Sequence, residues 1–170
     1  PLSALLYRGC FANHPGHLPR ICNREFHLSA GPYLYDFSAW AADFWQEVGF
    51  FNDTAPTEIS KQNLQKIQES VNCRGMFVTV FAYPALFRTR ADLSRFLPFR
   101  RVTDKQGMGF SLVTSPEGSI VAPENAFGIT DRIPTFVKNG IGRFIVDFSN
   151  IQPKKNFYRE VMTAALEGKV

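Results

Sequence analysis

The sequence predicts an α/β fold with mainly parallel strands and one inserted β-hairpin. Two short apolar runs, residues 76–83 and residues 144–148, carry this prediction. Runs that are apolar on both faces suit strands that are covered on both sides, as in parallel sheets. Each run follows a helical pattern and a glycine, which is the order of βα units. With 170 residues, 45% of them hydrophobic, the chain is expected to form a single domain, residues 1–170, with its own core.

Residues 1–31 are predicted to be an irregular N-terminal segment, because prolines and glycines punctuate it, with at most a short strand at residues 25–28. The segment carries four potential zinc ligands, Cys10, His14, His17 and Cys22. Their spacing matches no standard zinc motif. We therefore expect no metal site here, and read these residues as buried thiols and surface imidazoles.

The βα units are predicted over residues 32–170. Residues 33–36 are predicted to form a strand that ends in a carboxylate. Ser38 then caps a helix with an apolar stripe, which Gly49 ends. A short strand begins at Phe50, Ser60 caps the next helix, and the central strand follows at residues 76–83.

Beyond Tyr83 the pattern changes, because Pro84 prevents simple continuation of the strand. One helical turn is expected at residues 91–96. The inserted hairpin spans about residues 98–122, with antiparallel strands at 100–102 and 109–114 and a return at 119–121. Two more helical faces follow, one with Pro134 at a bend or in its first turn and one that ends before Gly168.

Positive charge is concentrated in one segment. Residues 88–105 hold six basic side chains against two acidic ones, while the whole chain has a net charge of +4. A local excess of this kind points to an anionic partner such as nucleic acid. The alternative is a solvated basic loop.

Composition excludes several protein classes. No apolar stretch approaches the ~20 residues of a membrane-spanning helix, so no membrane association is expected. Three cysteines are an odd number and do not suggest a disulfide scaffold. We therefore expect a cytoplasmic protein.

Four stretches resemble one known family. They are Ser38-Ala-Trp-Ala-Ala-Asp-Phe-Trp-Gln-Glu-Val-Gly49, Ala55-Pro-Thr-Glu-Ile-Ser60, Val80-Phe-Ala-Tyr-Pro-Ala-Leu86 and Asn139-Gly-Ile-Gly-Arg-Phe-Ile-Val-Asp147. Over residues 33–165 the chain resembles the collagenase-like peptidases of the U-thirty-two family. The resemblance implies a partial TIM-like (β/α) barrel, of which this chain would be the later part, and a peptidase-type hydrolase.

The resemblance also implies an alternative activity. Several relatives look like RNA- or cofactor-hydroxylation factors that hold an iron–sulfur cluster on cysteines after the strand equivalent to residues 76–83. Here that stretch, residues 84–90, contains no cysteine. The second hypothesis is therefore a modification accessory protein that has lost the cluster cysteines, and the third is a non-catalytic barrel module.

In a barrel, functional side chains collect at the carboxyl ends of the strands. The expected catalytic residues at those ends are Asp36, Glu58, Tyr83 and Asp147. The expected anion-binding residues are Arg88, Arg90, Arg100 and Arg101. For each carboxylate, a helix cap or a buried ion pair is the structural alternative. No serine or cysteine nucleophile motif is present.

Three kinds of partner are expected. The hydrolase hypothesis implies a peptide or protein substrate, and segment 88–105 implies nucleic acid. About five core strands are too few to close a barrel, and open sheet edges invite pairing. We therefore expect a homo-oligomer, a complementing barrel half or a cap formed by residues 1–31. No cofactor can be named from the sequence.

Overall fold

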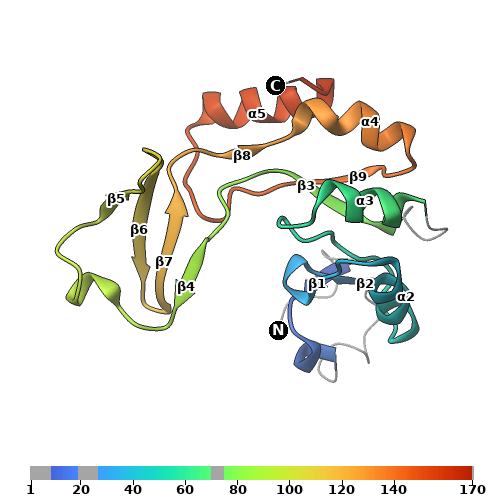
Figure 1. Ribbon diagram of the computed structural model, residues 1–170, viewed down its shortest axis with the longest axis horizontal. Coiled ribbons are helices and arrows are strands. Elements are labelled where there is room, and N and C mark those ends of the chain that lie inside the picture. The colour runs from blue at the N-terminus through green and yellow to red at the C-terminus, as the bar shows by residue number, and fades with distance from the viewer. Residues whose placement is uncertain (1–8, 19–26, 70–74, 170) are drawn as a thin grey trace. The chain divides into compact units, whose positions relative to one another are not determined.

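The computed structural model describes residues 9–18, 27–69 and 75–169 of the chain (Figure 1). Its contacts divide the chain into two compact units. Unit 1 comprises Pro1–Thr79 and Pro134–Ile145, and unit 2 comprises Val80–Ile133 and Val146–Val170. No helix among the described residues is long and apolar enough to cross a membrane.

Unit 1 is built on short parallel strand contacts. Strands β1 (Gly9–Ala12) and β2 (His27–Ala30) pair in parallel. Two isolated parallel bridges, Ser29 to Asn52 and Thr54 to Phe77, continue the pairing through a stretch that forms no regular strand. A small apolar cluster holds β1 and β2 together, with members Ala12, Leu28, Ala30 and Phe50 and with Cys10, Leu18, Leu34 and Trp45 packed against it.

Two helices of unit 1 begin directly after a serine that caps the N-terminus of the helix. Helix α2 (Ala39–Glu47) is capped by Ser38, and α3 (Lys61–Gln68) by Ser60, because each serine hydroxyl accepts a hydrogen bond from a first-turn backbone N–H. Most of α4 (Ile133–Lys138) also belongs to this unit. The described part of this unit also contains the 3₁₀ turns η1 (Pro15–His17) and η2 (Pro32–Leu34).

A three-stranded sheet has the order β8-β3-β9, with β3 at Phe77–Ala82, β8 at Phe127–Gly128 and β9 at Arg143–Val146. β8 pairs antiparallel to β3. All residues of β3 after Phe77 are buried, as expected for a strand that is covered on both faces.

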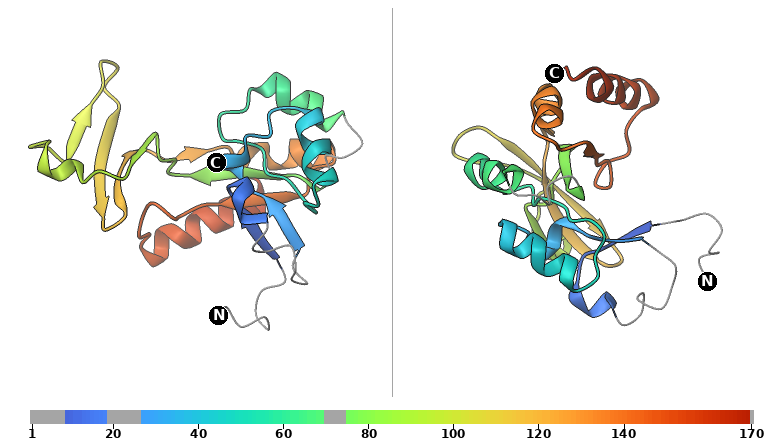
Figure 2. Two further views of the ribbon diagram at one scale, coloured as in Figure 1. Left: turned by 90° about the horizontal axis from the view of Figure 1, so that it is seen from below. Right: turned by 90° about the vertical axis from the view of Figure 1, so that its right-hand side faces the viewer.

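Unit 2 contains a four-stranded antiparallel sheet in the order β4-β7-β6-β5 (Figures 1 and 2). Its strands are β4 (Phe87–Thr89), β5 (Arg101–Thr103), β6 (Gly109–Ser115) and β7 (Gly118–Pro123). The 3₁₀ turn η4 (Leu93–Arg95) lies between β4 and β5 in the chain. Gly118 has φ +132°, and a Cβ there would lie 2.0 Å from the Thr89 carbonyl oxygen. Only glycine therefore fits at this turn.

The C-terminal helix of unit 2, α5 (Lys155–Glu167), ends at Gly168, which adopts the left-handed conformation. Its Phe157 ring lies in a cluster with Phe81 and Phe148, with centroids 5.5 to 6.5 Å apart. The 3₁₀ turn η5 (Thr130–Arg132) is joined to the end of the chain, because the Thr130 hydroxyl donates a hydrogen bond to the Lys169 carbonyl.

The predicted partial TIM-like barrel with mainly parallel strands is wrong. The described residues form sheets of two, three and four strands, and every pairing of the four-stranded sheet is antiparallel. An apolar run such as residues 76–83 reports burial on both faces and not strand direction. β8, too short to stand out in the sequence, supplies an antiparallel neighbour.

Many individual elements were predicted correctly. The structure confirms the helices after Ser38 and Ser60, the hairpin strands and the final helix before Gly168. The strand predicted at residues 144–148 is present as β9 but ends at Val146. Residues 33–36 are not a strand. Pro32–Leu34 forms a 3₁₀ turn, and Tyr35 closes it in the left-handed conformation, with φ 55° and ψ 54°.

Candidate functional site

Two carboxyl groups lie together in the interior of unit 1. Asp36 stands between Tyr35 and the capping Ser38 of α2, and Asp53 lies between the bridging residues Asn52 and Thr54. Asp36 and Asp53 are each 1% exposed. None of their four carboxyl oxygens completes a hydrogen bond of standard geometry with the residues that the structure describes. This arrangement is unusual, because most buried polar atoms are paired.

The electrostatics of the pair favour proton sharing. Burial raises the pKa of Asp36 to about 8, and the neighbouring Asp53 carboxyl adds to the shift by proton sharing and by its negative charge. Burial also raises the pKa of Asp53, while the contact with the neighbouring Asp36 carboxyl lowers it. Two carboxylates that share a dry site cannot both ionise at neutral pH. Loss of the last proton from the pair is therefore disfavoured at neutral pH, and Asp36, whose pKa is raised to about 8, is the carboxyl that retains it.

A pair in this state has a definite chemical capability. The protonated carboxyl can donate a proton, and the ionised carboxyl can accept one from a water molecule or a substrate. Carboxyl pairs whose pKa values are separated by their environment are the usual acid–base partners of hydrolytic sites. Asp36 and Asp53 form the candidate site of unit 1.

A polar network lies beside the pair. The Arg143 guanidinium donates a hydrogen bond to the Asn52 side-chain oxygen, and the Asn52 amide donates one to Ser29, at 3.3 Å. Cζ of Arg143 also lies 5.4 Å from the centroid of the Phe77 ring. Asn52 and Asp53 are adjacent, so the network fixes the backbone that carries the second carboxyl.

The other carboxylates expected at the site have local roles. Glu58 is exposed and accepts a hydrogen bond from the Thr57 hydroxyl. Asp147 accepts one from the Ser149 backbone N–H at 2.7 Å, which is the turn-capping alternative. Asp36 and Glu58 belong to unit 1, whereas Asp147, Tyr83 and Arg88 belong to unit 2.

Tyr83 contributes its backbone to local structure. Its carbonyl accepts a hydrogen bond from the Asn150 side-chain amide at 2.7 Å, and its ring packs edge-on against Phe81. No polar contact of the Tyr83 hydroxyl is seen among the described residues. The tyrosine therefore holds the loop after β9 against the end of β3.

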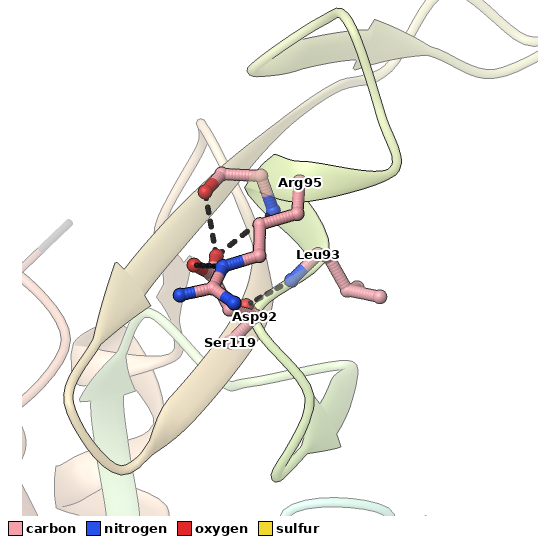
Figure 3. Close-up of polar contacts among 5 residues, drawn as sticks. Asp92, Leu93, Arg95 and Ser119 are labelled. Atoms are coloured by element: carbon pink, nitrogen blue, oxygen red, sulfur yellow. Dashed lines mark hydrogen bonds and ion pairs between the residues drawn. The ribbon is translucent and has the colours of Figure 1, made fainter.

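The arginines of segment 88–105 fall into two groups. Arg101 pairs with Glu124, and this contact holds the pKa of Glu124 below its usual range. Arg95 pairs with Asp92 at 3.2 Å, close to where Ser119 accepts the Leu93 N–H (Figure 3). The remaining arginines are exposed and form no ion pair within the described part of the chain: Arg88, Arg90 and Arg100.

A cavity of about 310 Å³ lies on the four-stranded sheet of unit 2. Arg88 and Glu117 line it, together with the apolar pair Val113 and Ile120. Arg88 faces Ile120 across β4 and β7, and Val113 faces Ile120 across β6 and β7. These three side chains therefore form one row on the same face of the sheet.

Parts of the cysteine–histidine group can be placed. Cys10 packs against the apolar cluster of β1 and β2, and the His14 Nδ1 accepts the Gly16 N–H at 3.0 Å. His14 and His17 are exposed. Cys22 and Cys73 lie outside the described residues. No group of three or more histidine, cysteine or acidic side chains suited to a metal occurs among the residues that the structure describes.

Sequence reasoning found Asp36 and missed Asp53. The polar run Asn52-Asp53-Thr54 follows two phenylalanines, so it reads as the turn after a strand. The sequence does contain an indication that Asp53 is buried, because Asp53 and Thr54 lie between apolar segments that a packed sheet would bury. The pairing of Asp36 with Asp53 could not be predicted, because the two residues are separated in the sequence and no local pattern links them.

Comparison with known proteins adds no assignment: no protein-family model matches the chain, and neither a curated protein nor a solved structure is significantly similar to it.

Proposed function

We propose that this chain is a peptidase-type hydrolase whose catalytic groups are Asp36 and Asp53. The observation that carries the proposal is the carboxyl pair of Asp36 and Asp53, each 1% exposed, and burial there raises the pKa of Asp36 to about 8. The sequence resemblance to collagenase-like peptidases agrees with hydrolysis of a peptide bond. A pair of this kind needs neither a serine nor a cysteine nucleophile.

The two carboxyls take complementary roles in this proposal. Asp53, ionised, accepts a proton from a water molecule whose oxygen attacks the carbonyl carbon of the peptide bond. Asp36 donates its proton to the carbonyl oxygen. Collapse of the tetrahedral intermediate breaks the C–N bond, and the proton on Asp53 passes to the leaving amine. The hydroxyl proton of the intermediate returns to Asp36, so the pair regains its starting state.

Substrate access requires local opening, because both carboxyls are buried. Tyr35 precedes Asp36 and is the one non-glycine residue with positive φ among the described residues. The left-handed conformation costs a tyrosine about 1–2 kcal/mol. We place the opening in this segment because its neighbours Tyr35 and Phe37 are exposed and stack on each other, 5.9 Å apart.

The test is peptide hydrolysis on a broad substrate set. The purified chain is incubated with a proteome-derived peptide mixture, and new termini are identified by mass spectrometry. Asp36→Asn and Asp53→Asn should each reduce cleavage by about 10²–10⁴-fold, the contribution of a positioned acid or base. Glu47→Gln, an exposed change in α2, should cleave like the wild type. Equal cleavage by wild type and Asp53→Asn would refute the proposal.

A second candidate function is binding of RNA, the role of a modification accessory protein. Arg90, Arg100 and Lys105 are exposed and lack a carboxylate partner among the described residues. Phe96 is 74% exposed within the same segment. Free cations beside exposed aromatic rings suit phosphate contact and base stacking.

The second function is tested with single-stranded RNA. Filter binding of a 20-nucleotide RNA at 50 and 200 mM salt should show affinity that falls with salt. The Arg90→Gln/Arg100→Gln double variant should have a shallower salt dependence. Binding that is unaffected by both salt and the double substitution would exclude this segment as the RNA contact.

A further inference from the structure

The cavity of unit 2 carries two opposite charges that do not neutralise each other. Arg88, on β4, and Glu117, in the turn between β6 and β7, both line the cavity. They form no ion pair with each other, and neither has another charged partner among the described residues. A ligand that carries a separate charge of each sign could satisfy both.

The rest of the lining supports a small ligand with polar ends and an apolar middle. Val113 and Ile120 provide an apolar floor in the same cross-strand row as Arg88. The Asn150 amide nitrogen is held by the Tyr83 carbonyl, which leaves the Asn150 side-chain oxygen as an acceptor at the cavity. A volume of about 310 Å³ is at the low end of small-molecule sites.

We propose that this cavity binds a zwitterion of the α-amino acid or short-peptide class. Arg88 binds the carboxylate, since its planar guanidinium matches the two carboxylate oxygens. Glu117 and the Asn150 side-chain oxygen accept hydrogen bonds from the ammonium group. Val113 and Ile120 contact an aliphatic side chain. A phosphate ion would satisfy Arg88 and would be repelled by Glu117, so the lining disfavours a simple anion.

This site is independent of the carboxyl pair, because all of its residues belong to unit 2 and the pair belongs to unit 1. Its binding is measured without any turnover. Failure of either proposal therefore leaves the other standing.

The test is titration calorimetry with the dipeptide Ala-Leu and its blocked forms. Ala-Leu should bind, and N-acetyl-Ala-Leu and Ala-Leu-amide should each bind about tenfold or more weakly, because each loses one charge-assisted contact. Arg88→Gln should weaken Ala-Leu about tenfold and leave Ala-Leu-amide unchanged. Glu117→Gln should weaken Ala-Leu and leave N-acetyl-Ala-Leu unchanged. Arg132→Gln, outside the cavity, is the control.

Three outcomes would overturn the proposal. Equal binding of free and blocked dipeptides would show that the cavity does not recognise the carboxylate and ammonium groups of the ligand. Binding of inorganic phosphate as tight as that of Ala-Leu, lost in Arg88→Gln only, would show a simple anion site. No heat with any probe, for a protein whose circular dichroism and unfolding transition are normal, would show that the cavity takes no zwitterion.

Discussion

Arg143 donates its hydrogen bond to Asn52 and forms no ion pair with the adjacent Asp53. The guanidinium is directed to a neutral amide and over the Phe77 ring. No Lys or Arg in the described part of the chain pairs with Asp53 or Asp36. Burial therefore acts on the two carboxyls without an opposing positive charge, which is the physical origin of their raised pKa values.

The Arg143 contact gives the first prediction. Arg143→Met retains the aliphatic packing and removes the donor, so the buried Asn52 oxygen loses its partner. We expect a loss of roughly 1–3 kcal/mol in the free energy of unfolding. Arg132→Met, which breaks only the exposed pair with Asp131, should cost less than about 1 kcal/mol. Urea unfolding measures both, and equal losses would contradict the buried role of Arg143.

Stability should fall as pH rises. In the folded state the pKa of Asp36 is about 8, above its ordinary value of 3.8. Between these values the folded state binds more protons than the unfolded state, so its stability decreases with pH until Asp36 is ionised. We expect a loss of roughly 1–3 kcal/mol from pH 5 to pH 9, less than the full shift implies because local relaxation and water entry ease the charged state.

Asp36→Asn cannot ionise, so its unfolding free energy should vary less with pH than that of the wild type. Glu47→Gln should retain the wild-type pH dependence. Urea unfolding at pH 5, 7 and 9 provides the comparison. Parallel curves for Asp36→Asn and the wild type would show that Asp36 titrates normally.

The backbone at Tyr35 gives a matched pair of substitutions. Both Tyr35→Asn and Tyr35→Val remove the ring that stacks on Phe37. Asparagine tolerates φ near 55°, whereas a β-branched residue does not. We expect the valine variant to be about 1 kcal/mol or more less stable than the asparagine variant. Equal thermal unfolding midpoints would mean that the left-handed conformation is not maintained.

Two glycines in unit 2 can be compared in the same way. Alanine at Gly118 would collide with the Thr89 backbone, and we expect Gly118→Ala to lose more than about 2 kcal/mol. Gly107 also has positive φ, at +86°, with no atom within 4 Å of a Cβ. Gly107→Ala should lose about 1 kcal/mol from backbone strain alone. A smaller loss at Gly118 than at Gly107 would contradict the described β4–β7 contact.

Local signals in the sequence predicted most elements, and long-range relations were not predicted. Ser38, Ser60 and Gly168 mark helix ends through contacts within one turn, so the sequence reveals them directly. The direction of the strand next to β3 depends on Phe127 and Gly128, which are about 45 residues away and form a strand too short to carry a pattern. A barrel was therefore expected where mixed sheets occur.

In the candidate site, too, residues with local signals were predicted and those that depend on long-range contacts were not. Asp36 was identified as a carboxylate at the end of a predicted strand, which the structure replaces with a 3₁₀ turn. Asp147 was correctly given a turn-capping alternative. Asp53 was missed, because its proximity to Asp36 arises only when residues 36 and 53 meet in the folded unit. Pairing with Asp92 and Glu124 likewise removed Arg95 and Arg101 from the free positive charge of segment 88–105.

The central claim is that Asp36 and Asp53 share one proton at neutral pH. The most direct measurement is a pH titration of the protein with ¹³C-labelled aspartate carboxyls, followed by NMR from pH 3 to pH 10 for the wild type, Asp36→Asn and Asp53→Asn. We predict one aspartate carboxyl that titrates near pH 8 in the wild type, is absent in Asp36→Asn and shifts to lower pH in Asp53→Asn. Titration of every aspartate carboxyl below about pH 5 in the folded wild type would contradict the shared proton and remove the basis for the proposed hydrolase.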